Sequence, residues 1–333
     1  MLTLTVPGLL ASGERALSTL PSASALARYV DSTTQERQGL GAALCTALSL
    51  PRGTPLAPLC AMGAGLSADD RNTICATPVT LVADRDVVVL AGPVIDLRAE
   101  EASALMELLN RHFAPDGVSF DAPRPATWFA RSERTFSLST WPVDAAKGRP
   151  IADYLPTGAD AKTWQRWQVE IQMLFHEHAI NNERAAREAA PISGVWLSGN
   201  GRLADVARPA FTCVLACGGE SGDLARGLAH HAGLSADTLP ATFSAILDRI
   251  RGSGHSLVAI ERISNEADMA RFDAVYLRPA VVALEMGQFD ALQLIADGQG
   301  TAITWHAERP SGWARMTSRL VHRALHIPST AEE

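Results

Sequence analysis

The stretch TCVLACGGESGDLARGLAHHA, residues 212–232, places an apolar run, a glycine-rich turn and an amphipathic segment in direct succession. Its first part, 212–216, predicts a buried strand, and 224–232 predicts a helix. Further along the chain, 243–251 predicts another helix and 257–261 another strand. Strands that alternate with helices are typical of a parallel sheet covered by helices. This half of the chain therefore predicts an α/β protein with a mainly parallel sheet.

The rest of the sequence predicts elements of both kinds. Ala99–Phe113 has apolar residues at helical spacing, and Asp160 is placed to cap a long helix that continues into 170–178. Further helices are predicted at 22–30 and 36–48. Strands are predicted at Leu2–Val6, 79–83, 87–90, 127–130, 135–138, 195–198, 292–296 and 302–305.

A chain of 333 residues is too long for one small core. The change in pattern near Pro78, and its return after Pro191, predict a discontinuous core made of residues 1–75 and 191–333. Residues 76–190 are predicted to form an inserted α+β lobe that ends in the long helix.

Composition excludes several classes of partner. Hydrophobic residues make up 47% of the chain and charged residues 20%, enough to bury a large core. The net charge of -7, with arginines scattered among acids, disfavours nucleic acid and anionic membranes as partners. The first twelve residues lack an early positive charge and are broken by Pro7 and Gly8, so they predict a buried strand and not a signal peptide. With five cysteines, an odd number, these features predict a cytoplasmic protein with reduced thiols.

A family resemblance rests on several motifs in the middle of the chain. They are GRP at 148–150, YLPTG at 154–158, Trp164, EIQMLFHEH at 170–178, Asn181, Arg184, Pro191 and VWLSGNG at 195–201. Their succession resembles the RpfE-type regulatory proteins of proteobacteria. The segment TPVTLVADRD at 77–86 is similar to the inserted lobe of archaeal-type cofactor-independent phosphoglycerate mutases. The resemblance implies an alkaline-phosphatase-like core.

The metal ligands that this resemblance would require are missing from their expected places. Mutases of this type use two metal ions and a Ser or Thr nucleophile for phosphoryl transfer. The first strand is followed by Pro7 and Gly8 in place of an Asp, and the first Asp of the chain is Asp31. No His follows the strand at 257–261, and His306 has no Asp beside it. We therefore predict no two-metal site, no metal and no cofactor, and assign no catalytic residue.

The best candidate site in the sequence is a polar set on and just after the long helix. Clefts between lobes are usual places for ligands, and Arg184 could hold an anion. The alternative is a hydrogen-bond network that joins the lobes. The set consists of Glu170, Gln172, His176, Asn181 and Arg184.

Other polar motifs have simpler structural interpretations. His176 and His178 are two apart on a helix and point in nearly opposite directions, so a shared metal ion is disfavoured. GNGRLA at 199–204 matches the start of a dinucleotide fingerprint, but Pro209 leaves too little room for the required helix. The turn at 217–222 could cap a helix and hold an anion, although Glu220 opposes the binding of an anion.

Three functional hypotheses follow. The first is a non-catalytic, regulatory protein that binds an anionic small molecule or a protein partner on a mutase-like scaffold. The second is a mutase-like or phosphatase-like enzyme with relocated chemistry, acting on a phosphorylated or carboxylated small molecule. The third is a structural subunit in which some of the seven tryptophans are interface anchors.

Overall fold

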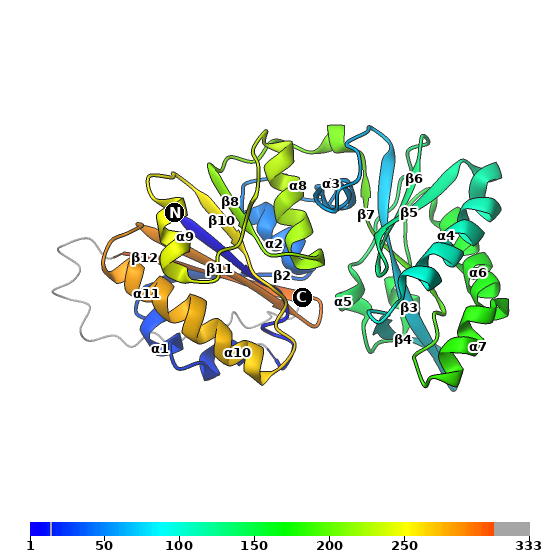
Figure 1. Cartoon of the computed structure of the whole chain (residues 1–333), viewed down its shortest axis with the longest axis horizontal. Helices are drawn as coiled ribbons and strands as arrows, with labels where there is room; N and C mark the ends of the chain where they lie inside the picture. The colour runs from blue at the N-terminus through cyan, green and yellow to red at the C-terminus, as the bar shows by residue number, and fades with distance from the viewer. Residues whose placement is uncertain (14, 310–333) are drawn as a thin grey trace. The chain divides into compact units, whose positions relative to one another are not determined.

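The computed structural model describes residues 1–13 and 15–309. These residues form two compact units, which we call the core unit (Met1–Arg52 and Arg208–Glu333, described as far as Arg309) and the inserted unit (Gly53–Ala207). Each unit has its own sheet and its own helices (Figure 1). The α/β class is therefore confirmed.

The sheet of the core unit has the strand order β2-β12-β11-β1-β10-β8-β9. Five neighbouring strands run parallel, from β11 to β9, and an antiparallel pair, β12 and β2, closes one edge. The bounds are β1 (Leu2–Val6), β2 (Val30–Glu36), β8 (Cys213–Ala216), β9 (Asp237–Thr238), β10 (Ser256–Ala259), β11 (Ala291–Gly298) and β12 (Thr301–Glu308).

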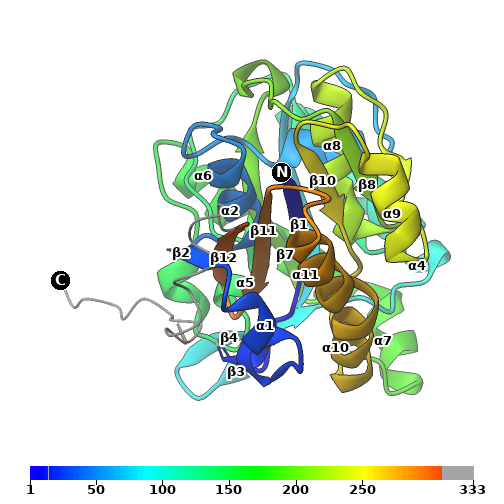
Figure 2. The ribbon, with the colours of Figure 1, turned by 90° about the vertical axis from the view of Figure 1, so that its left-hand side faces the viewer.

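Helices cover both faces of this sheet. Thr3 and Thr5 are buried like the apolar residues of β1, as expected where both faces of a parallel sheet are covered. Helix α2 contacts β11, β12 and β2, while α9, α10 and α11 contribute to one apolar core with β1 and β11 (Figure 2). The helices are η1 (Ala16–Thr19), α1 (Ala23–Leu26), α2 (Gly39–Ala47), η5 (Glu220–Gly222), α8 (Asp223–His231), α9 (Phe243–Ile250), α10 (Glu266–Phe272), the π-helical η6 (Asp273–Leu277) and α11 (Arg278–Glu285).

The inserted unit contains an antiparallel sheet in which β7 pairs along its whole length with the first half of β3, from Thr73 to Val79. Trp164 and Trp167 of the long helix α6 lie edge-on to Phe136 in its core. The strands are β3 (Asn72–Asp84), β4 (Val87–Pro93), β5 (Val118–Arg124), β6 (Thr127–Ser132) and β7 (Gly194–Gly201). The helices are α3 (Ala57–Gly63), α4 (Ala99–Phe113), η2 (Ala114–Asp116), α5 (Val143–Ala146), η3 (Ile151–Tyr154), α6 (Ala161–Glu177), α7 (Ala179–Ala186) and η4 (Leu203–Asp205).

The unit boundaries differ from those expected from the sequence. Residues 53–75 and 191–207 belong to the inserted unit, not to the core. The reason is strand pairing: β3 begins at Asn72, and β7 hydrogen-bonds along it from Gly194 to Gly201. The predicted strand at 195–198 is therefore real but lies in the antiparallel sheet, not in the parallel one.

Two local predictions were also wrong. The helix predicted at 22–30 is reduced to the single turn of α1, because Val30 begins the edge strand β2. The segment 135–138 forms no strand, and β6 pairs with β3 and β5. Among the described helices, none is long and apolar enough to cross a membrane.

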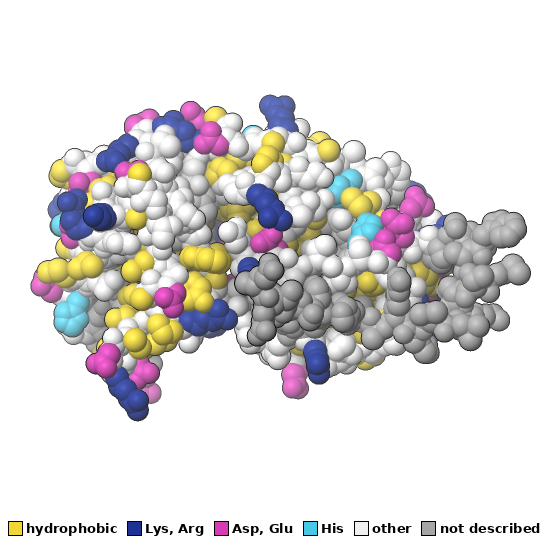
Figure 3. Space-filling model, turned by 180° about the vertical axis from the view of Figure 1, so that it is seen from behind, with side chains coloured by type: hydrophobic (Ala, Val, Ile, Leu, Met, Phe, Trp, Pro, Cys, Tyr) yellow, Lys and Arg dark blue, Asp and Glu magenta, His cyan; other side chains and the backbone are white. Residues whose placement is uncertain are grey.

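Surface charge is mixed in sign. On the face shown in Figure 3, basic and acidic side chains lie interspersed over both units. The described tryptophans are mostly internal: Trp128, Trp164, Trp167, Trp196 and Trp305 are buried, and Trp141 is half-buried. These five side chains serve the cores of their units; the seventh tryptophan lies outside the described residues.

Candidate functional site

Loops that follow the parallel strands are tied together at the carboxyl end of the core-unit sheet. The backbone N–H of Ile263 donates to the carbonyl of Pro7 over 2.8 Å, and that of Gly8 donates to Asp297 Oδ1 over 2.7 Å. These bonds join the segments after β1 and β10 to each other and to the end of β11. In open parallel α/β sheets, ligands bind beyond this end of the strands.

A pocket with a volume of about 200 Å³ lies at this edge, between the loop after β10 and helix α10 with its π-helical continuation. It is lined by Ile260, Glu261, Arg262, Ile263, Asp268, Arg271, Phe272 and Tyr276. Its lining combines apolar walls with a phenol, guanidinium groups and carboxylates.

Local structure positions each polar group of the pocket. The Asn265 side chain caps α10 by accepting from the Asp268 N–H over 2.9 Å, and Asp268 in turn accepts from the Ser264 N–H over 3.0 Å. Asp268 is therefore engaged in holding the helix start. Tyr276 lies in the π-helical turn η6, and such turns occur often at functional sites.

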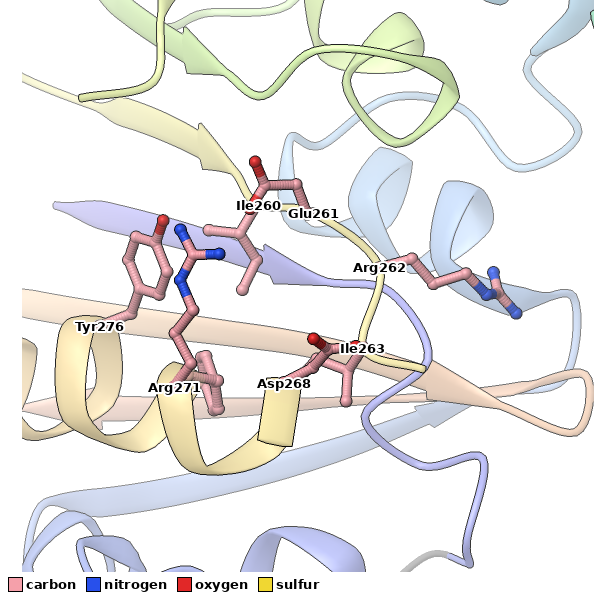
Figure 4. A pocket seen from close by; sticks show the side chains of 8 residues that line it. Ile260, Glu261, Arg262, Ile263, Asp268, Arg271 and Tyr276 are labelled. Atoms are coloured by element: carbon pink, nitrogen blue, oxygen red, sulfur yellow. The ribbon is translucent and has the colours of Figure 1, made fainter. Parts of the chain in front are cut away.

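Glu261 and Arg271 are the charged groups left available to a ligand. Both are exposed, and neither side chain forms an ion pair or hydrogen bond within the described part of the chain. Figure 4 shows Arg271 and Tyr276 extending side by side toward the end of β10, with Arg262 pointing away across the loop. A guanidinium beside a phenol can bind a carboxylate or phosphate.

Two side chains at this edge could act as nucleophiles if they were ionised, the Cys217 thiol and the Tyr276 phenol, but both are held protonated. Burial raises the pKa of the Cys217 thiol to about 11, and the Glu261 carboxylate adds to that effect. Burial and the same carboxylate also raise the pKa of the Tyr276 phenol, against the opposing charge of Arg271. At neutral pH both groups are hydrogen-bond donors, not anionic nucleophiles.

Two other acidic groups at the carboxyl end of the sheet, unlike Glu261, are engaged with protein donors. Asp297 accepts from Gly8, and Asp223 pairs with Arg226 over 2.5 Å. Within residues 1–13 and 15–309, the one trio of potential metal ligands consists of Asp31, His306 and Glu308. Those residues lie toward the opposite, amino-terminal end of the parallel strands, as the pairing of β12 with β11 shows.

The polar set expected from the sequence lies in the inserted unit and is dispersed along α6 and α7. Glu170 is 3.1 Å from His112 Nε2 and 3.3 Å from Arg166, and His176 is exposed. Gln172 is half-buried where α6 packs against β7. Asn181 bonds the backbone of Phe175 and both polar groups of Ile192.

Arg184, the fifth member, is fully buried. It donates to Glu101 over 3.0 Å, to Asp96 over 2.6 Å and to the Ala190 carbonyl over 2.7 Å. A guanidinium with no exposed surface and two carboxylate partners cannot clamp an anion from solution. The contacts of Asn181 and Arg184 are those of a structural network inside the inserted unit.

The inserted unit has a second pocket, of about 340 Å³, lined in part by Arg71 and Arg131. Asp69 bridges both arginines over 2.7 and 2.9 Å, and Asp121 accepts from Arg131 over 2.8 Å. The arginine charges are already balanced, so this pocket is a weaker anion site than the one with Arg271.

Together, fold and pocket define an α/β protein with a small candidate pocket at the carboxyl end of a largely parallel sheet. No family model matches the chain, and no curated protein matches it. Among solved structures, it is similar to the PH0037 protein from Pyrococcus horikoshii, with 11% identity and a TM-score of 0.49, covering 92% of this chain and 87% of that one. It is also similar to a cofactor-independent phosphoglycerate mutase from Thermoplasma acidophilum, with 13% identity and a TM-score of 0.44, covering 97% and 92%. The RpfE-type resemblance stays a prediction.

The pocket residues were not selected from the sequence. Glu261 ends a predicted strand, and the rule that ligands bind beyond parallel strands could have marked it. Arg271 and Tyr276 belong to a helical segment that carries no motif, and the fold alone brings them to the strand end.

Proposed function

We propose that this chain is a non-catalytic, regulatory protein whose core-unit pocket binds an anionic small molecule. The observation that supports this most is the position of the Arg271 side chain, which has no ion-pair partner among the described residues, next to the Tyr276 side chain beside the end of β10. The phosphoglycerate-mutase-like scaffold and the cytoplasmic location expected from the sequence are parts of this proposal.

The pocket favours a ligand of a few carbon atoms that carries a carboxylate or phosphate and a hydroxyl group. Its volume of about 200 Å³ is below the roughly 300–1,000 Å³ of pockets for drug-sized molecules. Arg271 supplies two parallel donors for an anionic group, and Tyr276 supplies a third. Glu261 is placed to accept a hydrogen bond from the ligand hydroxyl.

Binding without turnover is favoured by the protonation of the groups nearby. Cys217 would need to be a thiolate to act as a nucleophile, and its raised pKa opposes this at neutral pH. Tyr276 is likewise held as a neutral phenol. These groups suit the recognition of an anion more than attack on it.

The proposal is tested by a thermal-shift screen of small phosphorylated and hydroxycarboxylic metabolites at millimolar concentration, followed by calorimetry of the hits. We expect at least one ligand to raise the Tm, and Arg271→Met to weaken its binding at least 10-fold. Arg251→Met is the matched control, because Arg251 is an exposed arginine of the same unit whose partner is Asp248. This control should leave ligand affinity unchanged.

Two results would contradict the proposal. One is a screen in which no anionic metabolite stabilises the protein. The other is turnover of the bound ligand, detected as released phosphate and lost in Arg271→Met. That second result would establish the enzyme alternative, with chemistry relocated to this pocket.

A further inference from the structure

The antiparallel edge of the core-unit sheet contains an irregularity between β12 and β2. His306 pairs with Ser32, but the next residue, Ala307, pairs with Val30. Asp31 is therefore an extra residue on β2 with no partner opposite it, which is a β-bulge. Bulges re-aim side chains and are enriched at sheet edges and near functional sites.

This bulge brings Asp31 to the same place as two residues of β12. His306 and Glu308 are two apart on a strand, so their side chains point to the same face. His306 Nε2 is 3.1 Å from Glu308 Oε1. Ligand atoms of Asp31, His306 and Glu308 all lie within 4.8 Å of one another.

We propose that these three residues bind one divalent transition-metal cation, for which Zn²⁺ is the probe. One imidazole and two carboxylates are a donor set suited to such ions, and the two carboxylates balance the charge of the cation. Bonds of about 2.0–2.1 Å require tetrahedral ligand atoms to be roughly 3.4 Å apart. The ligand atoms of the trio must therefore approach one another by up to about 1.4 Å, and its two carboxylates are exposed and can rotate. Water would complete the coordination.

The orientation of His306 supports this assignment. Its Nδ1 atom is buried and makes no hydrogen bond with any described residue, while Nε2 lies 3.1 Å from the Glu308 carboxylate. The nitrogen that a cation from solvent can reach is thus the one beside Glu308. Binding of a cation there places the remaining imidazole proton on Nδ1.

A bound cation would link the edge strand β2 to β12, and so would stabilise the core unit. The trio and the Arg271 pocket lie toward opposite ends of the parallel strands. The two proposals are therefore independent, and metal bound here would not indicate a two-metal catalytic centre.

Calorimetric titration of the chelator-treated full chain with ZnCl₂ tests the site. We expect one ion per chain to bind with micromolar or tighter affinity and to raise the Tm by about 3 °C or more. Asp31→Asn and Glu308→Gln should each weaken binding at least 10-fold and abolish the shift in Tm. Both residues are exposed, so both variants are expected to fold.

Glu36→Gln is the control, since Glu36 is an acid of the same strand outside the trio. It should bind Zn²⁺ like the parent chain. Zinc binding that is equal in Asp31→Asn, Glu308→Gln and Glu36→Gln would place the ion at other side chains and overturn the proposal. Failure of the parent chain to bind any Zn²⁺ would do the same.

Discussion

Arg184 of the inserted unit shows how a buried charge is tolerated in this protein. Its guanidinium has no exposed surface, and Glu101, which is 7% exposed, accepts from it and from Arg187. Asp96 completes the arrangement from a more exposed position. Removal of Arg184 would leave the buried Glu101 carboxylate with only the partly exposed Arg187 as its guanidinium partner, which is costly, whereas exposed pairs contribute little.

Replacement of Arg184 by Met should therefore lower the free energy of unfolding by about 3–5 kcal/mol, because Glu101 would lose its buried partner. Arg111→Met is the control: Arg111 and Glu107 are 70% and 75% exposed, and its expected cost is about 0.5 kcal/mol or less. Urea denaturation of both variants provides the measurement. Small and equal losses in the free energy of unfolding of the two variants would contradict this role of Arg184.

Position 8 requires glycine for two reasons, its backbone conformation and the close approach of a neighbouring carbonyl group. Its φ is +79°, and an added Cβ would lie 2.4 Å from the Ile263 carbonyl oxygen. Gly8→Ala should lower the free energy of unfolding by about 3 kcal/mol or more, from left-handed strain plus the clash. Gly233 has a φ of +80° and no atom within 4 Å of the added Cβ, so Gly233→Ala should cost only about 1 kcal/mol. Thermal or chemical denaturation measures the difference, which isolates the contact at Ile263.

Burial raises the pKa values of Cys45 and Cys217 to about 11. At pH 8 only about one thiol in a thousand would be ionised, so both should resist iodoacetamide in the native protein. Peptide mapping before and after unfolding in urea at the same pH provides the test. Rapid native labelling of Cys217 would revive a nucleophilic role for it.

At the scale of elements, helices α4 and α7 are joined by the Arg184 cluster. Hydrogen bonds and charge from Arg184 lower the pKa of Asp96. For Glu101, burial favours the protonated form, but the N–H of Arg98, Arg187 and the nearby positive charges outweigh it, and the pKa is lowered. Carboxylates with lowered pKa values stabilise the fold above their ordinary values and lose that contribution as pH falls.

The stability difference between the parent chain and Arg184→Met should therefore depend on pH. It should be constant above about pH 5, because both carboxyl groups are ionised in both folded and unfolded states. It should shrink below the ordinary pKa values of 3.8 and 4.5, as protonation removes the charges that Arg184 compensates. Denaturant titrations from pH 3 to 7 measure this trend; a difference that grows toward low pH would contradict it.

Elements with strong periodicity were predicted well, and those without it were not. β1 and α4 occupy the predicted residues, because their apolar residues follow a clear period or run. β2, with the sequence VDSTTQE, is a mostly polar edge strand, and tertiary pairing alone makes it a strand. The π-helical turn at Asp273–Leu277 depends likewise on its surroundings. For the same reason, neither Tyr276 nor Asp31 could be assigned to a site from sequence alone.

At the scale of the whole molecule, the units differ in how their chain segments meet. The inserted unit is continuous from Gly53 to Ala207, whereas the core unit is assembled from two separate segments. The sequence predicted a discontinuous arrangement but placed its boundaries inside the antiparallel sheet. Boundaries of that kind depend on which strands pair, and β7 follows a proline-containing loop that carries no sign of its partner.

The continuity of the inserted unit makes independent folding a testable expectation. It contains a complete five-stranded sheet, and its main apolar cluster is built from its own residues, with Trp128 and Trp164 at its centre. A segment of about 150 residues buries enough surface to be stable alone. Residues 53–207 should therefore unfold cooperatively on heating and show near-ultraviolet circular dichroism from fixed tryptophans. Arg184→Met should lower the Tm of this fragment. Asn182→Ala changes an exposed residue of the same helix and should leave the Tm unchanged. A fragment with helical signal but no cooperative transition would show that the core unit is needed to complete the packing of the insert.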